Sequence, residues 1–222
     1  MTIDEFVLER GIREVVHFTQ RRGLLGICFT HALLPRSELS HEQLLEFILN
    51  VNAAIRNDKE WFDHVNLSIN NINRRFFDAS TSWHKGAEKT WWVILSFDPE
   101  ILSHAKVWFA TTNNGYPGVE RQPGAAGLEA IYSEPITHGW SWPKHRRHPT
   151  TRYEDPTCPQ AEALYPGRLS TRYLRRVYVP DEATYREASS FLTFLPNRRD
   201  LTITIEESRF SPFIIDPCKT GQ

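Results

Sequence analysis

A stretch of 48 residues, Thr112 to Pro159, constrains the fold of this chain more than any other feature of its sequence. It holds seven prolines and five glycines, which interrupt both the helical and the strand periodicity of apolar residues. Loops beyond about 15 residues are uncommon inside compact domains, where they are usually lids, binding loops or disordered insertions. We therefore expect one long irregular loop at 112–160, with regular elements before and after it.

Short apolar runs on both sides of this stretch predict strands, and longer periodic segments predict helices. Strands are expected at 14–19, 65–69, 91–97, 106–110, 161–165, 174–179 and 201–205. Helices are expected at 41–55 after a capping-box pattern, at 73–83, and from Pro180 to about Leu195. The mixed order, with strands concentrated after the helices, predicts an α+β fold with mixed or antiparallel sheets and flanking helices.

The length of 222 residues, with 40% hydrophobic residues, is enough for one well-packed core. Neither an internal repeat nor a low-complexity linker divides the chain, so we expect a single domain over 1–222. The sequence has no signal-peptide pattern and no apolar stretch near the ~20 residues that a membrane span needs, which predicts a cytoplasmic protein without a membrane partner. Three distant cysteines and nine histidines show no ligand spacing, so no metal is expected.

Positive charge is concentrated in one part of a nearly neutral chain. The formal net charge is -1, which argues against binding nucleic acid with the whole surface. Residues 135–180, however, hold eight Lys or Arg and only three Asp or Glu. This part contains a cluster of aromatic and basic residues, namely Trp140, Trp142, Lys144, Arg146 and Arg147. Such rings can stack on bases while the cations contact phosphates; the alternative is a solvated basic loop whose tryptophans complete the core.

Three residues of types common in catalysis lie in or beside regular elements. His17 lies on the first expected strand, Arg56 follows the helix at 41–55, and Glu162 lies in an apolar strand directly after the long loop. Each also has an ordinary structural explanation, as a core histidine, a helix-end cation and an outward-facing carboxylate. Glu162 could instead lie at the mouth of a cleft with a raised pKa. Phosphate-binding and serine-hydrolase motifs are absent, which leaves NTPase and serine-hydrolase functions without support.

The order of these features resembles the DarT family of DNA ADP-ribosyltransferase toxins. The elements that carry the resemblance are His17-Phe18-Thr19, Arg56, the long loop and Gln160-Ala161-Glu162. The resemblance covers about residues 14–195, and the Gln-Ala-Glu element with the strand and helix that follow it is its most specific part. It implies an ADP-ribosyltransferase fold, NAD as co-substrate, and a substrate-recognition loop at about 112–160.

The resemblance also implies roles for single residues. Glu162 and Arg56 would be catalytic, while His17, Thr19 and Phe77 would bind NAD; a core-facing position in its helix explains Phe77 equally well. The residues expected to contact single-stranded DNA are Asn113, Trp140, Trp142, Lys144, Arg146 and Arg147 in the loop, with Arg74. A macrodomain-containing antitoxin would be the partner that removes the modification.

The implied chemistry agrees with these residue types. Cleavage of the bond between ribose and nicotinamide passes through an oxocarbenium-like transition state, whose positive charge a carboxylate such as Glu162 can stabilise. A base in single-stranded DNA is unpaired, so no unpairing cost arises. We expect guanosine as the modified base, because 109–114 lacks the histidine of the thymidine-modifying branch and because 41–55 and 65–69 look more like the guanosine-modifying branch.

Two other functions stay open at this point. One keeps the fold but changes the acceptor to RNA, protein or water, the last giving an NAD glycohydrolase. The other is a non-catalytic module that binds single-stranded nucleic acid through its tryptophans and arginines alone.

Overall fold

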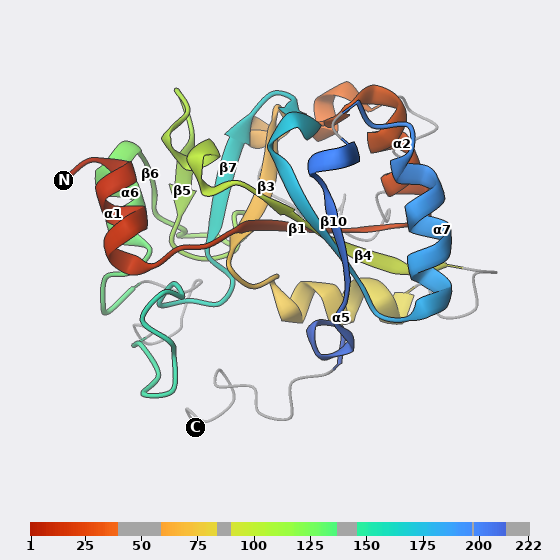
Figure 1. Ribbon diagram of the computed structural model, residues 1–222. Coiled ribbons are helices and arrows are strands. Elements are labelled where there is room, and N and C mark those ends of the chain that lie inside the picture. Colours follow the sequence, from red (N-terminus) through yellow and green to blue (C-terminus); the bar gives the residue numbers. More distant parts are fainter. Residues whose placement is uncertain (40–58, 84–89, 137–145, 197, 212–222) are drawn as a thin grey trace.

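The computed structural model describes residues 1–39, 59–83, 90–136, 146–196 and 198–211 (Figure 1). The described residues form ten strands: β1 Val15–Gln20, β2 Ala32–Leu33, β3 His64–Ile69, β4 Trp92–Phe97, β5 Trp108–Ala110, β6 Arg121–Pro123, β7 Glu162–Pro166, β8 Leu169–Ser170, β9 Leu174–Val179 and β10 Thr202–Ile205. Its α-helices are α1 Ile3–Arg10, α2 Arg21–Thr30, α5 Arg74–Trp83, α6 Gly124–Ala130 and α7 Glu182–Leu192. Short 3₁₀ turns lie at 36–38, 59–61, 99–103, 171–173, 198–200 and 207–209.

Eight of these strands form one sheet in the order β10-β9-β4-β1-β3-β7-β5-β6, and β2 and β8 form a separate pair. All neighbours in the large sheet are antiparallel except β9 and β10, which are parallel. The predicted α+β fold with a mixed sheet is therefore confirmed. Among the described residues, none of the helices has the length and apolar character needed to cross a bilayer.

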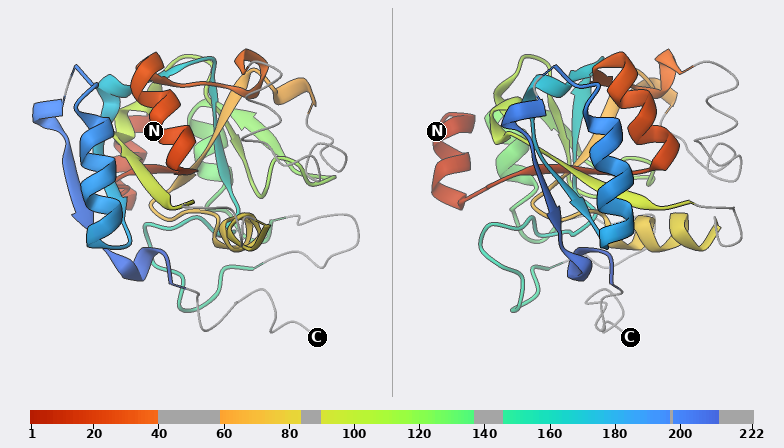
Figure 2. Two further views of the ribbon diagram at one scale, coloured as in Figure 1. Left: turned by 90° about the vertical axis from the view of Figure 1, so that its right-hand side faces the viewer. Right: turned by 45° about the vertical axis from the view of Figure 1, so that its right-hand side comes forward.

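The two faces of the sheet are covered by different helices (Figures 1 and 2). α2 and α7 pack together over β1, β4 and β9, where Val15, Leu95 and Val177 belong to the main core. The residues that alternate with these point to the other face, where Phe77 of α5 belongs to a smaller cluster. The central strands are thus buried on both sides, which explains their nearly continuous apolar sequence.

β1 has two unequal neighbours. It pairs with β4 over all six of its residues, from Val15 to Gln20. With β3, in contrast, it pairs only at Val15 and Val16. Beyond Val16 the sheet therefore opens between β1 and β3, and the later part of β1 faces a gap in the ladder.

Most expected strands and helices are present, but α1 and α2 were not expected and the expectation for 112–159 is wrong. α2 begins at Arg21 directly after β1, and Leu24, Ile27 and Cys28 are its buried face. The stretch 112–159 is not wholly irregular, because β6 and α6 lie within it. A Cβ on Gly127 of α6 would lie 1.9 Å from the carbonyl oxygen of Gln122, so this glycine allows the close packing of helix and strand. The helix expected at 41–55 lies outside the described residues.

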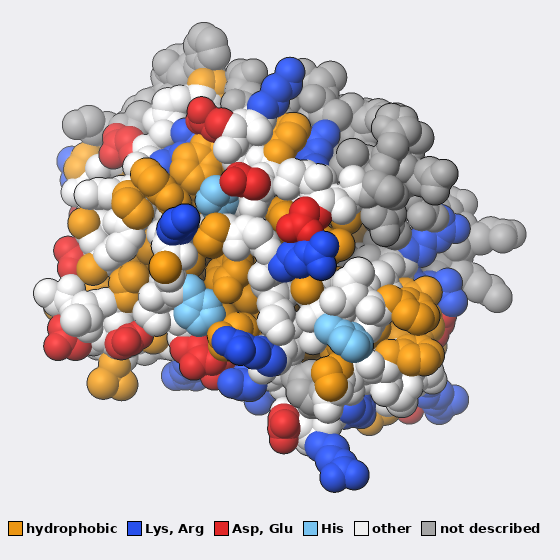
Figure 3. Space-filling view, turned by 90° about the horizontal axis from the view of Figure 1, so that it is seen from above, with side chains coloured by type: hydrophobic (Ala, Val, Ile, Leu, Met, Phe, Trp, Pro, Cys, Tyr) orange, Lys and Arg blue, Asp and Glu red, His pale blue; other side chains and the backbone are white. Residues whose placement is uncertain are grey.

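Charged side chains of both signs are interspersed on the face seen from above in Figure 3. This agrees with the formal net charge of -1. On the described part of that face, no extended area of one sign is visible.

Candidate active site

A pocket of about 290 Å³ is lined by β1 and β3 at the place where the sheet opens. β1 contributes residues 16–20, including His17, Phe18 and Thr19, and β3 contributes Asn66 and Ser68. Further lining residues come from α2, from the segment 32–39, from α5, from Trp92 of β4 and from the first residue of β7, Glu162. Seven segments of the chain thus converge on one cavity, which is the usual form of a small-molecule site.

His17 is held by the main chain of β3. Its Nδ1 lies 3.0 Å from the carbonyl oxygen of Asn66. A carbonyl oxygen can only accept, so Nδ1 carries the proton in the neutral ring and Nε2 is the acceptor. Burial lowers the pKa of His17 below its ordinary value of 6.5, although the bond to Asn66 acts in the opposite direction. The ring is therefore neutral at pH 7.

Thr19 lies against the first turn of α2. A Cβ on Gly23 would lie 2.0 Å from Thr19 Oγ1, so only glycine leaves room for this hydroxyl where it stands. Gly23 and Gly26 both line the pocket beside Thr19. Two glycines are unfavourable in a helix of ten residues. We attribute Gly23 to the packing of the pocket rather than to helix formation.

Glu162 is 7% exposed and its carboxylate is oriented by two N–H donors. Oε2 accepts from Asn66 Nδ2 at 2.7 Å and from the backbone N–H of Asn114 at 2.9 Å. These bonds compensate for the burial of a charged group and fix its position. Asn66 contacts both His17 and Glu162, so one residue of β3 joins two residues that are 145 positions apart in the sequence.

The start of the long loop is anchored beside Glu162. Asn114 is fully buried, and Arg121 donates from Nε to its Oδ1 at 2.5 Å and from a second nitrogen to its carbonyl oxygen at 2.7 Å. Tyr116 donates to Gln160 Oε1 at 3.0 Å. The Gln-Ala-Glu element is thus bonded to the loop on both sides of its alanine.

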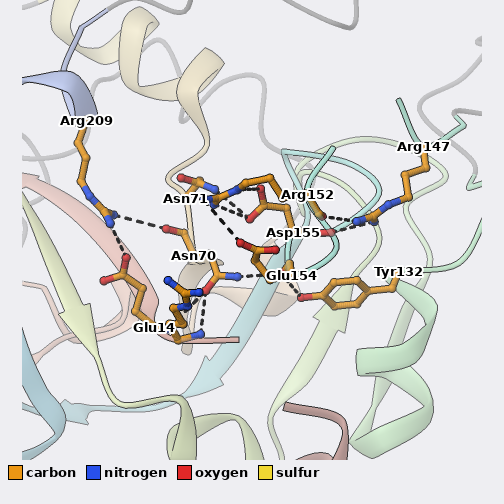
Figure 4. A network of polar contacts seen from close by, with 10 residues as sticks. Glu14, Asn70, Asn71, Tyr132, Arg147, Arg152, Glu154, Asp155 and Arg209 are labelled. Carbon is orange, nitrogen blue, oxygen red and sulfur yellow. Dashed lines mark hydrogen bonds and ion pairs between the residues drawn. The ribbon is translucent and has the colours of Figure 1, made fainter. Parts of the chain in front are cut away.

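The later part of the loop is tied to the chain that follows β3, as Figure 4 shows. Asn70 Nδ2 donates to the carbonyl oxygen of Glu154 at 2.8 Å, and Asn71 Nδ2 donates to Asp155 Oδ1 at 3.0 Å. Arg147 donates to the carbonyl oxygen of Asp155 at 2.8 Å and also bonds the carbonyl oxygen of Arg152. Residues 147–155 of the loop are therefore held against the rest of the domain by these hydrogen bonds.

The candidate DNA contacts fall into three groups. Trp140, Trp142 and Lys144 lie outside the described residues. Arg146 is exposed, whereas Arg147 is bonded within the network above and the Asn113 side chain accepts from the N–H of Gly115. Arg74 is also bonded within the protein: it forms an ion pair with Asp78 and donates to the carbonyl oxygens of Arg209 and Phe210, at 3.3 and 2.9 Å.

The candidate NAD and catalytic residues are also distributed unequally. His17, Thr19 and Glu162 line one pocket. Arg56 lies outside the described residues. Phe77 is 3% exposed and packs against Phe18 and Trp92 within the smaller cluster, while its neighbour Phe76 lines the pocket. Successive residues of a helix point about 100° apart, and sequence alone could not tell which of the two phenylalanines faces the cavity.

Sequence reasoning missed the residue that joins the site. Asn66 alternates with Val65 and Leu67, which point into the core, so its polar side chain was readable as lying on the opposite face of the strand. The sequence did not show that Glu162 lies on the same side of the sheet as the Asn66 side chain. Among the described residues, no three His, Cys, Asp or Glu side chains are grouped so as to hold a metal ion.

The family model described as "ssDNA thymidine ADP-ribosyltransferase, DarT" matches residues 16–210. The chain belongs to the DarT family. Membership assigns it to the NAD-dependent ADP-ribosyltransferases that modify single-stranded DNA, as the sequence predicted. The description names thymidine, whereas the sequence analysis favours guanosine.

Solved structures agree with this assignment at the level of the fold. DarT from Thermus sp. 2.9 in complex with NAD+ is 16% identical with a TM-score of 0.60, over 89% of this chain and 96% of that chain. The same protein in complex with ADP-ribosylated ssDNA gives 14% identity and a TM-score of 0.62, over 90% and 96%. DarTG from Thermosipho africanus in complex with ADP-ribose gives 11% and 0.55, over 89% of this chain and 51% of that chain. A search of curated proteins found no match.

Proposed function

We propose that this protein transfers ADP-ribose from NAD to a base of single-stranded DNA in the pocket between β1 and β3. The observation that carries the proposal is the bridge through Asn66, which holds neutral His17 and the Glu162 carboxylate at one cavity. The Thermus protein of the same fold has been solved with NAD+ and with ADP-ribosylated ssDNA, which supports both substrates.

Glu162 is the catalytic carboxylate of this proposal. The bond between ribose C1′ and the nicotinamide nitrogen breaks, and its electron pair leaves with nicotinamide, which becomes neutral. The negative charge of Glu162 stabilises the positive charge that develops on the ribose. A nitrogen of the acceptor base then bonds to C1′, and the proton that it loses passes to Glu162 or to water. Asn66 and Asn114 hold the carboxylate in place throughout.

Three further pocket residues suit NAD as the donor. His17 offers an acceptor at Nε2 and Thr19 offers a hydroxyl, both suited to ribose and carboxamide groups. Arg36 also lines the pocket, with its guanidinium 4.3 Å from the ring centre of Phe62. A guanidinium here suits the negative charge of a diphosphate. Arg56 keeps the catalytic role that the family resemblance implies.

We propose guanosine as the modified base. The support is the family resemblance, because residues 109–114 contain no histidine, which the thymidine-modifying branch carries at this place. The loop residues Asn113, Trp140, Trp142, Lys144 and Arg146 are the proposed contacts to the DNA strand, while Arg147 and Arg74 would act mainly by holding the loop and residues 209–210 in place.

We also propose that the protein is the toxin of a cytoplasmic toxin–antitoxin pair. Its partner would be an antitoxin with a macrodomain that removes ADP-ribose from DNA. The support is the family resemblance and the likeness to the DarTG structure. A macrodomain hydrolase added to the modified oligonucleotide should restore its original mass; an adduct that resists every such hydrolase would contradict this part.

The test is an adduct assay with purified protein, NAD and four acceptor sets: single-stranded oligonucleotides rich in one base each, their duplexes, RNA and protein. Mass spectrometry should find ADP-ribose on single-stranded DNA that contains guanosine. An adduct on thymidine alone would overturn the choice of base. Transfer only to RNA, to protein or to water would overturn the choice of acceptor.

Substitution at Glu162 tests the mechanism. Glu162→Gln keeps the size of the side chain but removes its charge, so the transfer rate should fall at least about 100-fold. Glu129→Gln makes the same change at an exposed position of α6 and should leave the rate unchanged. If the Glu162 variant transfers ADP-ribose as fast as the wild type, Glu162 is not the catalytic carboxylate.

A further inference from the structure

Asn73 stands directly before α5, and its side chain is 3% exposed where it lines the pocket. Its Oδ1 accepts from the backbone N–H of Phe76 at 3.1 Å, which is the bond of a helix N-cap. This bond also identifies the two ends of the amide, since only the oxygen can face an N–H donor. The NH2 group is therefore the other end.

That NH2 group has no hydrogen-bond partner among the residues that the structure describes. A buried amide donor without a partner is costly and rare in folded proteins. An N-cap needs only the oxygen, and aspartate would supply it without a buried amide donor. Helix capping thus explains the oxygen of this side chain and leaves its NH2 group without an assigned role.

Three aromatic side chains line the same pocket as Asn73. Phe18, Phe76 and Trp92 line it together with Asn73, and the ring centre of Phe18 lies 5.5 Å from that of Phe76 and 5.8 Å from that of Trp92. An apolar, aromatic wall beside an amide donor suits a flat heterocycle that carries a carbonyl oxygen.

We propose that Asn73 Nδ2 donates a hydrogen bond to the carbonyl oxygen of a heterocycle bound in the aromatic part of the pocket, which makes Asn73 a specificity-determining residue. The inference rests on the proposed function and names a contact within it. Two substrates carry such a carbonyl group: NAD, in its nicotinamide carboxamide, and the acceptor base. The chemistry of recognition is the same for both.

Three variants separate ligand binding from capping. Asn73→Asp has nearly the same shape and keeps the capping oxygen but lacks the donor at pH 7 and above. Asn73→Ser also keeps a capping oxygen and adds no charge. Its only donor is the hydroxyl group, which is bonded directly to Cβ. Asn73→Ala loses both the cap and the donor. The melting temperature of Asn73→Ser should match the wild type, while that of Asn73→Ala should be lower because the cap is lost. Asn73→Asp keeps the cap but buries a charge, so its melting temperature should also be lower.

Calorimetric titration with NAD and with ADP-ribose, together with the KM for the oligonucleotide, measures the effect. Loss of one hydrogen bond should weaken binding by about three- to tenfold. If Asn73 contacts nicotinamide, both capping variants bind NAD more weakly but bind ADP-ribose, which lacks the ring, as the wild type does. If it contacts the base, both nucleotides bind normally and the oligonucleotide KM rises.

The inference is overturned if Asn73→Asp and Asn73→Ser match the wild type in all three measurements, or if NAD and ADP-ribose binding fall by the same factor. It is also overturned if only Asn73→Ala differs from the wild type, because Asn73 would then be a cap alone. Failure of the wild type to form an adduct would contradict the proposed function, whereas the titrations with NAD and ADP-ribose still test Asn73.

Discussion

Gly23 and Gly26 on α2 allow a prediction with an internal control. Both are helical, both line the pocket and they lie three residues apart. A Cβ on Gly26 would meet no atom within 4 Å, whereas a Cβ on Gly23 would lie 2.0 Å from Thr19 Oγ1. Replacement by alanine thus changes backbone freedom equally at the two positions but changes packing at only one.

The expected changes in the free energy of unfolding follow from backbone freedom and from packing. Alanine is better than glycine inside a helix by about 1 kcal/mol, so Gly26→Ala should raise the free energy of unfolding by about that amount. At Gly23 the same gain is offset, because Thr19 Oγ1 must move by more than 1 Å to reach a normal contact. Overpacking of this kind costs about 1–3 kcal/mol. Gly23→Ala should therefore be less stable than Gly26→Ala by about 1–3 kcal/mol.

Urea unfolding of the two variants and the wild type measures this difference. For a domain of this size, about 1 kcal/mol corresponds to roughly 2–4 °C in melting temperature, so thermal unfolding should show Gly26→Ala above the wild type and Gly23→Ala clearly below Gly26→Ala. Equal unfolding free energies for the two variants would refute the reasoning, because the contact with Thr19 would then carry no cost.

Three further predictions concern pH, a buried network and the loop. Because burial lowers the pKa of His17, the unfolded chain binds this proton first, and the free energy of unfolding should fall as pH drops below 6.5, more steeply in the wild type than in His17→Gln. Glu14 is 9% exposed and accepts from Ser96, Tyr178 and Arg209, so Glu14→Ala should cost about 3–5 kcal/mol in urea unfolding. Arg146→Ala should weaken binding of single-stranded DNA and make the slope of log affinity against log salt concentration shallower, by the amount that corresponds to about one phosphate contact. Arg147→Ala should mainly lower the melting temperature. Unchanged DNA binding in Arg146→Ala would remove that residue from the proposed interface.

Seven of the ten strands in the described residues were predictable because their signal is local, whereas the short strands β2, β6 and β8 were not predicted. Apolar runs such as 91–97 and 174–179 are short and bounded by turn residues, and they form β4 and β9 within a residue of the expected bounds. α1, α2 and α6 were not predicted; α2 and α6 each contain two glycines, which sequence patterns associate with turns. In α2 and α6 one glycine lies close to the strand that precedes the helix, Gly23 to Thr19 and Gly127 to Gln122, and hydrophobic periodicity does not describe such a contact.

The candidate site was predictable in its residue types but not in its connections. His17, Thr19 and Glu162 were identified from their place beside strands and from the family resemblance, and they line one pocket. Asn66 and Asn73 could not be identified from local patterns. Asn66 matters because it bonds Glu162, which is distant in the sequence. Asn73 matters because its amide donor has no partner among the described residues. Such features depend on the sheet register, which periodicity does not determine.

The direct junction between β1 and α2 has a consequence for how this protein can change over evolution. Gln20 ends the strand and Arg21 begins the helix, so no loop residue separates Thr19 from Gly23. One inserted residue would rotate the helix by about 100° relative to the strand and turn Gly23 away from Thr19. We therefore expect insertions and deletions to be tolerated in the long loop but eliminated between residues 17 and 26, where the spacing of the residues is itself part of the binding site.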